Sequence, residues 1–146
     1  MNLKFLAVSV ISLFSIGCTA ISVKPVSSEE KVSHICIKEN PKVIVSGFSE
    51  ALEDNFESNL VTTQFFSGKK PDGCQYVLEY TALQSWDFVT YLSYAELKLY
   101  KDNSRVGYAE YRLRGKGGLS LLKWRGPKSK LKPVIEELLS EQKNGA

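Results

Sequence analysis

The three cysteines and the only histidine of this sequence can form covalent bonds or bind a metal ion. His34 and Cys36 are two residues apart, so their side chains point to the same side if both lie on a strand. Cys74 can pair with Cys36 in a disulfide. Alternatively, it can complete a set of three nitrogen and sulfur ligands, which suits zinc or copper. Both readings remain open at this point.

The third cysteine, Cys18, follows an apolar run. Lys4 precedes twelve uncharged residues, 5–16, and this run is shorter than the roughly 20 residues that cross a bilayer as a helix. The residues at 15–17 resemble the lipobox of bacterial lipoproteins, although Ser15 stands where leucine is commonest. The resemblance implies cleavage after Gly17 and a covalent lipid, with its acyl chains, on Cys18. Because Thr19 is not aspartate, it also implies the periplasmic face of the outer membrane rather than the inner membrane. An ordinary signal peptide cut elsewhere is the alternative.

An exported domain enters an oxidising compartment, and this favours the disulfide. Cys36 and Cys74 are the two cysteines left once Cys18 carries lipid, and a bond between them closes a loop of 38 residues. In the chain-entropy picture such a loop stabilises the fold by about 4 kcal/mol. We therefore predict a Cys36–Cys74 disulfide, no bound metal and no cofactor besides the lipid. A metal site with His34, or two unpaired thiols, are the alternatives.

The sequence contains no nucleophile elbow and no phosphate-binding loop. Glu79, Glu96 and Glu110 are expected on neighbouring strands, where a pair of carboxylates can cleave a glycosidic bond. They alternate with Lys98 and Arg112, and cross-strand charge pairing accounts for that pattern. We predict no catalytic residues, and a hydrolase is only the third hypothesis.

The segment 112–132 is basic, with no acidic residue in it. Basic residues beside tryptophan can bind anionic lipid head groups, while a net charge of +3 is too small to indicate nucleic acid as a partner. The alternative is a solvated loop whose leucines pack on the core. The candidate contacts with an anionic surface are Lys123, Trp124, Arg125, Lys128 and Lys130.

The hydrophobic pattern predicts an α+β two-layer sandwich, with a mixed four- to five-stranded sheet and two helices on one face. Strands are expected at 34–39, 61–66, 74–83, 88–101 and 105–115, and helices at 46–60 and 130–142. Pro133 is expected in the opening turn of the second helix, where proline is tolerated. The domain organisation is a signal peptide over 1–17, a lipidated cysteine with a flexible tether over 18–33, and one periplasmic domain over 34–146.

Several segments together resemble the Sbal-type family of uncharacterised Gram-negative lipoproteins: the lipobox at Cys18, "CIKENPKV" at 36–43, "DGCQYVLEYTA" at 72–82 and "GGLSLLKW" at 117–124. That family implies no activity. We therefore expect an outer-membrane-anchored periplasmic lipoprotein that acts as a binding or assembly module of the cell envelope. Its partners would be the membrane, through the lipid, and an envelope protein. A lipid- or envelope-polymer-binding accessory factor is the alternative.

Overall fold

The computed structural model describes residues 19–118 and 120–144. The predicted signal peptide and Cys18 lie outside the described residues. The strands are β1 (Thr19–Lys24), β2 (His34–Lys38), β3 (Thr62–Phe66), β4 (Tyr76–Asp87), β5 (Val89–Lys101) and β6 (Ser104–Leu113). The helices are α1 (Phe48–Glu57), α2 (Pro127–Leu138) and the short α3 (Ser140–Asn144), with 3₁₀ turns η1 (Arg114–Gly117) and η2 (Leu121–Trp124).

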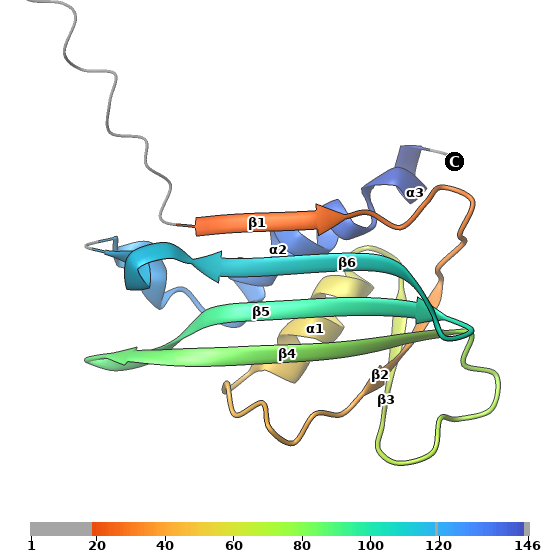
Figure 1. Ribbon diagram of the computed structural model, residues 1–146, viewed down its shortest axis with the longest axis horizontal. Helices are drawn as coiled ribbons and strands as arrows, with labels where there is room; N and C mark the ends of the chain where they lie inside the picture. The colour runs from red at the N-terminus through yellow and green to blue at the C-terminus, as the bar shows by residue number, and fades with distance from the viewer. Residues whose placement is uncertain (1–18, 119, 145–146) are drawn as a thin grey trace, which may run out of the picture.

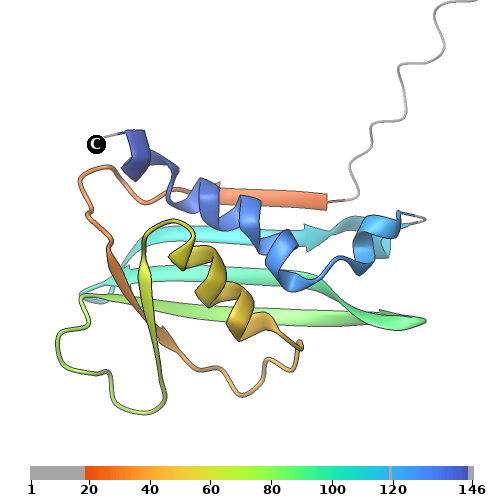
Figure 2. The same ribbon diagram turned by 180° about the vertical axis from the view of Figure 1, so that it is seen from behind.

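The strands form one mixed sheet in the order β1-β6-β5-β4-β2-β3. The pairs β1–β6, β6–β5 and β5–β4 are antiparallel, while β2 is parallel to both β3 and β4. Helices α1 and α2 lie on the same face of the sheet, as Figures 1 and 2 show from opposite sides. The α+β class and the two helices on one face are confirmed. The sheet has six strands rather than four or five.

The antiparallel part of the sheet follows the alternation of its sequence. Along β4, the residues Tyr76, Leu78, Tyr80 and Ala82 are buried, as their spacing predicts. β5 and β6 are joined at Asp102 and Asn103, which both have positive φ, as a two-residue type I′ hairpin turn requires. Asparagine and aspartate tolerate this conformation better than other non-glycine residues do.

Both helices differ from the prediction at their N-termini. Helix α1 begins at Phe48, two residues later than expected, and is preceded by Gly47 in the left-handed conformation. Helix α2 begins at Pro127, so Pro133 lies inside the helix rather than in its opening turn. Asn55 joins the two helices, because its buried side-chain amide donates to the carbonyl of Lys128 at 3.0 Å. No helix among the described residues is long and apolar enough to cross a membrane.

The expected tether is the main correction to the fold. Residues 19–24 form the edge strand β1, which pairs with β6 from Thr19 opposite Leu113 to Lys24 opposite Tyr108. Val26 is fully buried, and its amide donates to the carbonyl of Leu138 at 2.9 Å. A Cβ on Gly107 would lie 2.7 Å from the side chain of Val26, so glycine allows this segment to approach the sheet closely. The predicted domain boundary at residue 34 therefore falls inside the folded unit.

The rest of the expected tether is also fixed. The carboxylate of Glu30 accepts hydrogen bonds from the hydroxyl of Tyr76 at 2.6 Å and from the ammonium of Lys101 at 2.8 Å. Its carbonyl accepts from the side chain of Gln142 at 2.6 Å. One residue thus ties the N-terminal segment to β4, to β5 and to the C-terminal helix.

Candidate functional site

The disulfide predicted from the sequence is present. Cys36 on β2 bonds to Cys74, just before β4, and their Cα atoms are 5.9 Å apart. Both cysteines are buried. The closed loop contains α1 and β3, so the bond ties the parallel part of the sheet to its antiparallel part.

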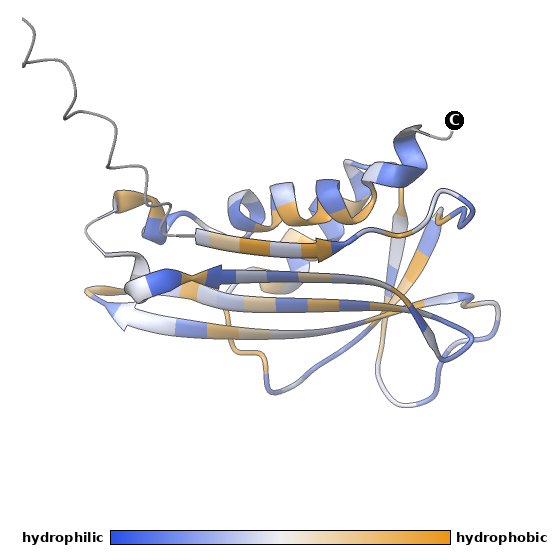
Figure 3. Ribbon diagram, turned by 45° about the horizontal axis from the view of Figure 1, so that its top comes forward, coloured by the Kyte–Doolittle hydropathy of each residue, from blue (hydrophilic) through white to orange (hydrophobic). Residues whose placement is uncertain are grey.

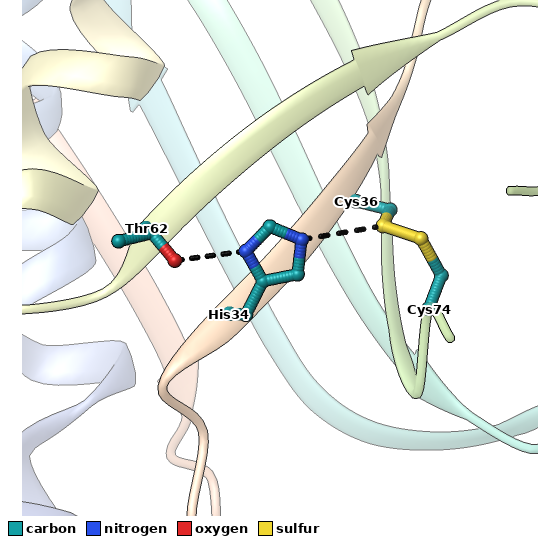
Figure 4. The surroundings of a disulfide bond; sticks show 4 residues. All are labelled: His34, Cys36, Thr62 and Cys74. Carbon is teal, nitrogen blue, oxygen red and sulfur yellow. Dashed lines mark hydrogen bonds between the residues drawn. A yellow bond between two sulfur atoms is a disulfide. The ribbon is translucent and has the colours of Figure 1, made fainter. Parts of the chain in front are cut away.

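His34 lies beside this disulfide, with Thr62 on its other side (Figure 4). Its Nδ1 is 2.8 Å from the hydroxyl of Thr62, and its Nε2 is 3.7 Å from the sulfur of Cys36. The sequence prediction that His34 and Cys36 share a side of their strand is confirmed.

Lys123 lies inside the fold, although it was expected to contact an anionic surface. Its side chain is 8% exposed, and its ammonium pairs with the carboxylate of Asp87 and donates to the carbonyl of Gly118 at 3.1 Å. Gly117 makes this packing possible: it has positive φ, and a Cβ on it would lie 2.8 Å from the Cβ of Lys123. Lys123 therefore joins η2 to the end of β4, and its charge is already neutralised.

Lys130 is buried as well. Its ammonium donates to the carbonyl of Leu92 at 2.9 Å and to the carbonyl of Lys123. It also lies over the rings of Tyr91 and Tyr111, at 5.5 and 5.9 Å from their centroids. Removal from water lowers the pKa of Lys130 to about 8. This residue holds η2 against β5 and is not available to a surface.

The other three predicted contact residues are exposed. Lys128 pairs with Asp54 of α1 at 2.8 Å. Arg125 is exposed, and Trp124 is 38% exposed while its indole N–H donates to the carbonyl of Asp87 at 3.3 Å. The prediction of a basic contact surface is therefore wrong for Lys123 and Lys130, because their charges are satisfied inside the protein. For Trp124, Arg125 and Lys128 it remains a prediction.

The sequence analysis missed a cluster of exposed apolar side chains at one end of the molecule, which we name the apolar tip. It combines the turn between β4 and β5 with η2. The two parts are neighbours, because Lys123 and Trp124 of η2 bond to Asp87 at the end of β4. The members and their exposed fractions are Trp86 72%, Phe88 84%, Val89 54%, Leu121 73%, Leu122 57% and Trp124 38%. The sequence feature that could have predicted this cluster is the run "WDFV" at a hairpin turn, where polar residues are expected.

Phe88 has an unusual backbone conformation. It sits between Asp87 and Val89, which face each other across the hairpin, and its φ is 64°. This left-handed region is costly for a bulky side chain and is commonly occupied at functional positions. The turn thus holds an aromatic ring in water at a conformational cost, although a glycine would avoid that cost.

The predicted carboxylates lie on the sheet face opposite the helices. Glu96 and Glu110 face each other across β5 and β6, and the hydroxyl of Tyr108 lies 2.7 Å from Glu110 and 3.3 Å from Glu96. The hydrogen bond from Tyr108, with help from Arg112, lowers the pKa of Glu110. An acid for glycoside cleavage needs a raised pKa instead. Glu79 pairs with Lys38 at 3.0 Å. Glu96 and Glu110 pair along their own strands, with Lys98 at 2.7 Å and Arg112 at 3.1 Å. Charge pairing therefore accounts for all three carboxylates, but the cross-strand pairing expected from the sequence holds for Glu79 alone.

The fold class is a small α+β two-layer sandwich, and similar proteins exist among solved structures. Two crystal structures of the PelC dodecamer from Paraburkholderia phytofirmans, one of them a point variant, each superpose with a TM-score of 0.53. The variant is 9% identical and the match covers 85% of this chain and 96% of PelC; for the other structure the values are 10%, 84% and 97%. At this identity the likeness concerns the fold alone. No family model matches the chain, and no curated protein matches it.

Proposed function

We propose that this chain is an outer-membrane-anchored periplasmic lipoprotein whose domain lies against the bilayer by its apolar tip and serves as a binding or assembly module. The anchor would be the lipid on Cys18, and the chain would need no other cofactor. The observation that carries the proposal is that the apolar tip and the start of the described chain share one end of the molecule.

Three observations support that placement. Thr19, the residue after Cys18, pairs with Leu113 at the end of β6. After β6 the chain runs into η1 and then into η2. Leu121, Leu122 and Trp124 of η2 belong to the apolar tip. Figure 3 shows apolar colouring on η2 and at the β4–β5 turn, at the end where β1 begins. A lipid attached just before Thr19 would therefore bring the apolar tip to the membrane surface.

The composition of the apolar tip suits a bilayer interface. Tryptophan favours the boundary between head groups and acyl chains. Full removal of a Leu- or Phe-sized side chain from water contributes about 1.5–3 kcal/mol, so a partly immersed set of six would still contribute several kcal/mol. Arg125 and Arg114 lie nearby at the surface and can reach phosphate groups.

The role as an assembly module is the less specific part of the proposal. The similar PelC structures are dodecamers. For this chain, the partner would be further copies of itself or another envelope protein, bound by surfaces that the membrane contact leaves free. Crosslinking in intact cells followed by mass spectrometry tests this part. Recovery of monomer alone at native expression would contradict it.

Both tryptophans of the chain, Trp86 and Trp124, belong to the apolar tip, so selectively excited tryptophan fluorescence reports on this surface alone. The lipidated protein is reconstituted into vesicles that contain lipids brominated at different depths. We expect the tryptophan emission to shift to the blue relative to that of the protein without vesicles. We also expect strong quenching by bromines near the interface. Phe88→Asp should reduce the quenching at least several-fold without removing the protein from the vesicles, because the lipid still anchors it.

Leu60→Asp is the matched control, because Leu60 is 90% exposed and follows the C-terminal end of α1, outside the apolar tip. It should leave the quenching unchanged. Tryptophans that stay fully accessible to a water-soluble quencher in the reconstituted protein would contradict the membrane contact. Quenching that is absent while the protein forms a closed oligomer would assign the apolar tip to contacts between copies of the chain.

A further inference from the structure

The group formed by His34, Cys36 and Cys74 has no part in the proposed membrane contact. Their donor atoms all lie within 4.8 Å of one another. The two sulfurs are bonded to each other, so they offer no metal site in the oxidised protein. The position of the imidazole beside them points to a second state.

The hydrogen bonds around Thr62 fix the tautomer of His34. The hydroxyl of Thr62 donates to the carbonyl of Ser33 at 3.2 Å, and its single proton is thereby used. Thr62 must then accept from His34, so Nδ1 carries the hydrogen of a neutral imidazole. The lone pair of His34 is consequently on Nε2, the nitrogen that faces the sulfur of Cys36 at 3.7 Å.

The lone pair on Nε2 receives no stabilising hydrogen bond from the disulfide. The sulfur of a disulfide has no proton to donate, so with this tautomer neither atom of the 3.7 Å contact drawn dashed in Figure 4 supplies a hydrogen. Reduction changes this, because a thiol can donate a proton to Nε2, and a cation can be shared by Nε2 and a thiolate. We propose that His34, Cys36 and Cys74 form a binding site for a thiolate-binding d¹⁰ cation, Zn²⁺ or Cu⁺, when the disulfide is reduced.

The distances fit a shared ion. Zinc binds histidine nitrogen at about 2.0–2.1 Å and cysteine sulfur at about 2.3 Å with tetrahedral angles, so the two donors are about 3.6 Å apart. The observed separation of His34 Nε2 and the sulfur of Cys36 is 3.7 Å. Two thiolates on the same ion are about 3.8 Å apart by the same geometry, so only the sulfur of Cys74 has to move once the bond is broken.

The surroundings also resemble those of metal-binding histidines. Such histidines commonly donate their second ring N–H to an oxygen, which fixes the ring orientation, and Thr62 accepts this bond here. Both cysteines are buried, whereas His34 is partly exposed. An ion can therefore enter from the side of His34, and a water molecule can occupy the fourth position.

The reaction balances with a thiol reductant. Two thiols of the reductant give two electrons and two protons to the Cys36–Cys74 bond and become a disulfide themselves. Binding of Zn²⁺ then displaces the two thiol protons of Cys36 and Cys74, so metal binding strengthens as the pH rises. Exchange with a small-molecule disulfide, which takes up the two electrons and becomes two thiols, would re-form the Cys36–Cys74 bond and release the ion. The site would thus couple metal binding to the redox state of its compartment.

The test uses full-length protein with Cys18→Ser, which removes the third thiol. The protein is reduced with a phosphine, desalted under nitrogen and titrated with Zn²⁺ against a chromophoric chelator. We expect one Zn²⁺ per chain in the reduced protein and none in the oxidised protein. Co²⁺ in place of Zn²⁺ should give thiolate-to-metal charge-transfer absorption. His34→Ala should weaken Zn²⁺ binding at least 10-fold, and Thr62→Val by about 10- to 100-fold.

Thr63→Val is the matched control, because Thr63 is the next residue on β3 and its hydroxyl has no hydrogen-bond partner among the described residues. It should not change the affinity. Zn²⁺ should also raise the melting temperature of the reduced protein, since a ligand of the native state stabilises it. A lowered melting temperature would mean that unfolded chains bind the metal, and it would overturn the proposal. So would an unchanged affinity in His34→Ala, or no stoichiometric binding after reduction.

Discussion

At the scale of single residues, the two buried lysines have different ways of keeping a charge inside the protein. Lys123 has a carboxylate, Asp87, as its partner. Lys130 has carbonyl oxygens and aromatic rings as its partners, and burial lowers its pKa from 10.5 to about 8. A shift of this size corresponds to about 3 kcal/mol. The free energy of unfolding is lower by about this amount at neutral pH, because the charged form of Lys130 is buried.

Between about pH 8 and pH 10 the unfolded chain keeps a proton on Lys130 that the folded chain has released, so the free energy of unfolding should rise with pH. Above pH 10 the tyrosines reverse the trend. Burial raises the pKa of Tyr111 to about 12, and the hydrogen bond to Glu110 raises that of Tyr108, so the unfolded chain loses these protons first. Urea denaturation at a series of pH values measures the curve.

Lys130→Met isolates the contribution of this lysine. The variant should lack the rise between pH 8 and pH 10 and keep the fall above pH 10, whatever its absolute stability. Lys128→Met is the matched control, because Lys128 is exposed on the same helix. A rise that survives in Lys130→Met would show that another group is responsible.

At the scale of secondary structure elements, the segment before β2 is held to the sheet by Glu30. The hydrogen bonds from Lys101 and Tyr76 lower the pKa of Glu30. A carboxylate with a lowered pKa contributes stability above its ordinary value of 4.5, and this contribution is lost as the pH falls through the value in the folded protein. Glu30→Gln should therefore be less stable than the wild type at pH 7 and differ less from it below pH 4.

Hydrogen exchange gives a local measure of the same prediction. In Glu30→Gln the amide of Val26, which bonds to Leu138, should exchange faster than in the wild type at pH 7. The exposed neighbour Glu29 provides the control, and Glu29→Gln should leave this exchange unchanged. Equal protection of Val26 in both variants would mean that the segment is held by β1 and the apolar contacts alone.

The elements that the sequence predicts correctly are those whose own pattern specifies them. Alternation over 76–82 places β4, and the turn at Asp102 and Asn103 places the hairpin. β1 is an edge strand in which no side chain is fully buried, and apolar and polar residues alternate only over 21–24. This pattern is too short to predict a strand, and the pairing with β6 is what shows one. Lys130 is polar and looks like a surface residue until Leu92 and Tyr91 are brought beside it by the fold.

At the scale of the whole molecule, the surfaces have different characters. Helices α1 and α2 cover one face of the sheet, the opposite face carries paired charges, and the apolar tip occupies the end where β1 begins. Because Lys123 is neutralised by Asp87 and Lys128 by Asp54, the apolar tip is closer to neutral than the sequence of 112–132 suggests. This difference decides which force should hold the domain on a membrane.

A chain that begins at Thr19 tests this, because it contains all described strands and helices but lacks Cys18. Electrostatic binding would need anionic vesicles and would be released as salt shortens the screening length to about 8 Å at 0.15 M. Apolar insertion should instead give weak binding to neutral and anionic vesicles alike, within a few-fold, and little release by salt. Phe88→Asp should abolish this binding, and Lys128→Gln should not change it. Sedimentation with vesicles measures all four combinations of lipid and salt. Binding that requires anionic lipid and disappears at high salt would restore the basic residues as the contact surface, and the apolar side chains of the tip would then need another partner.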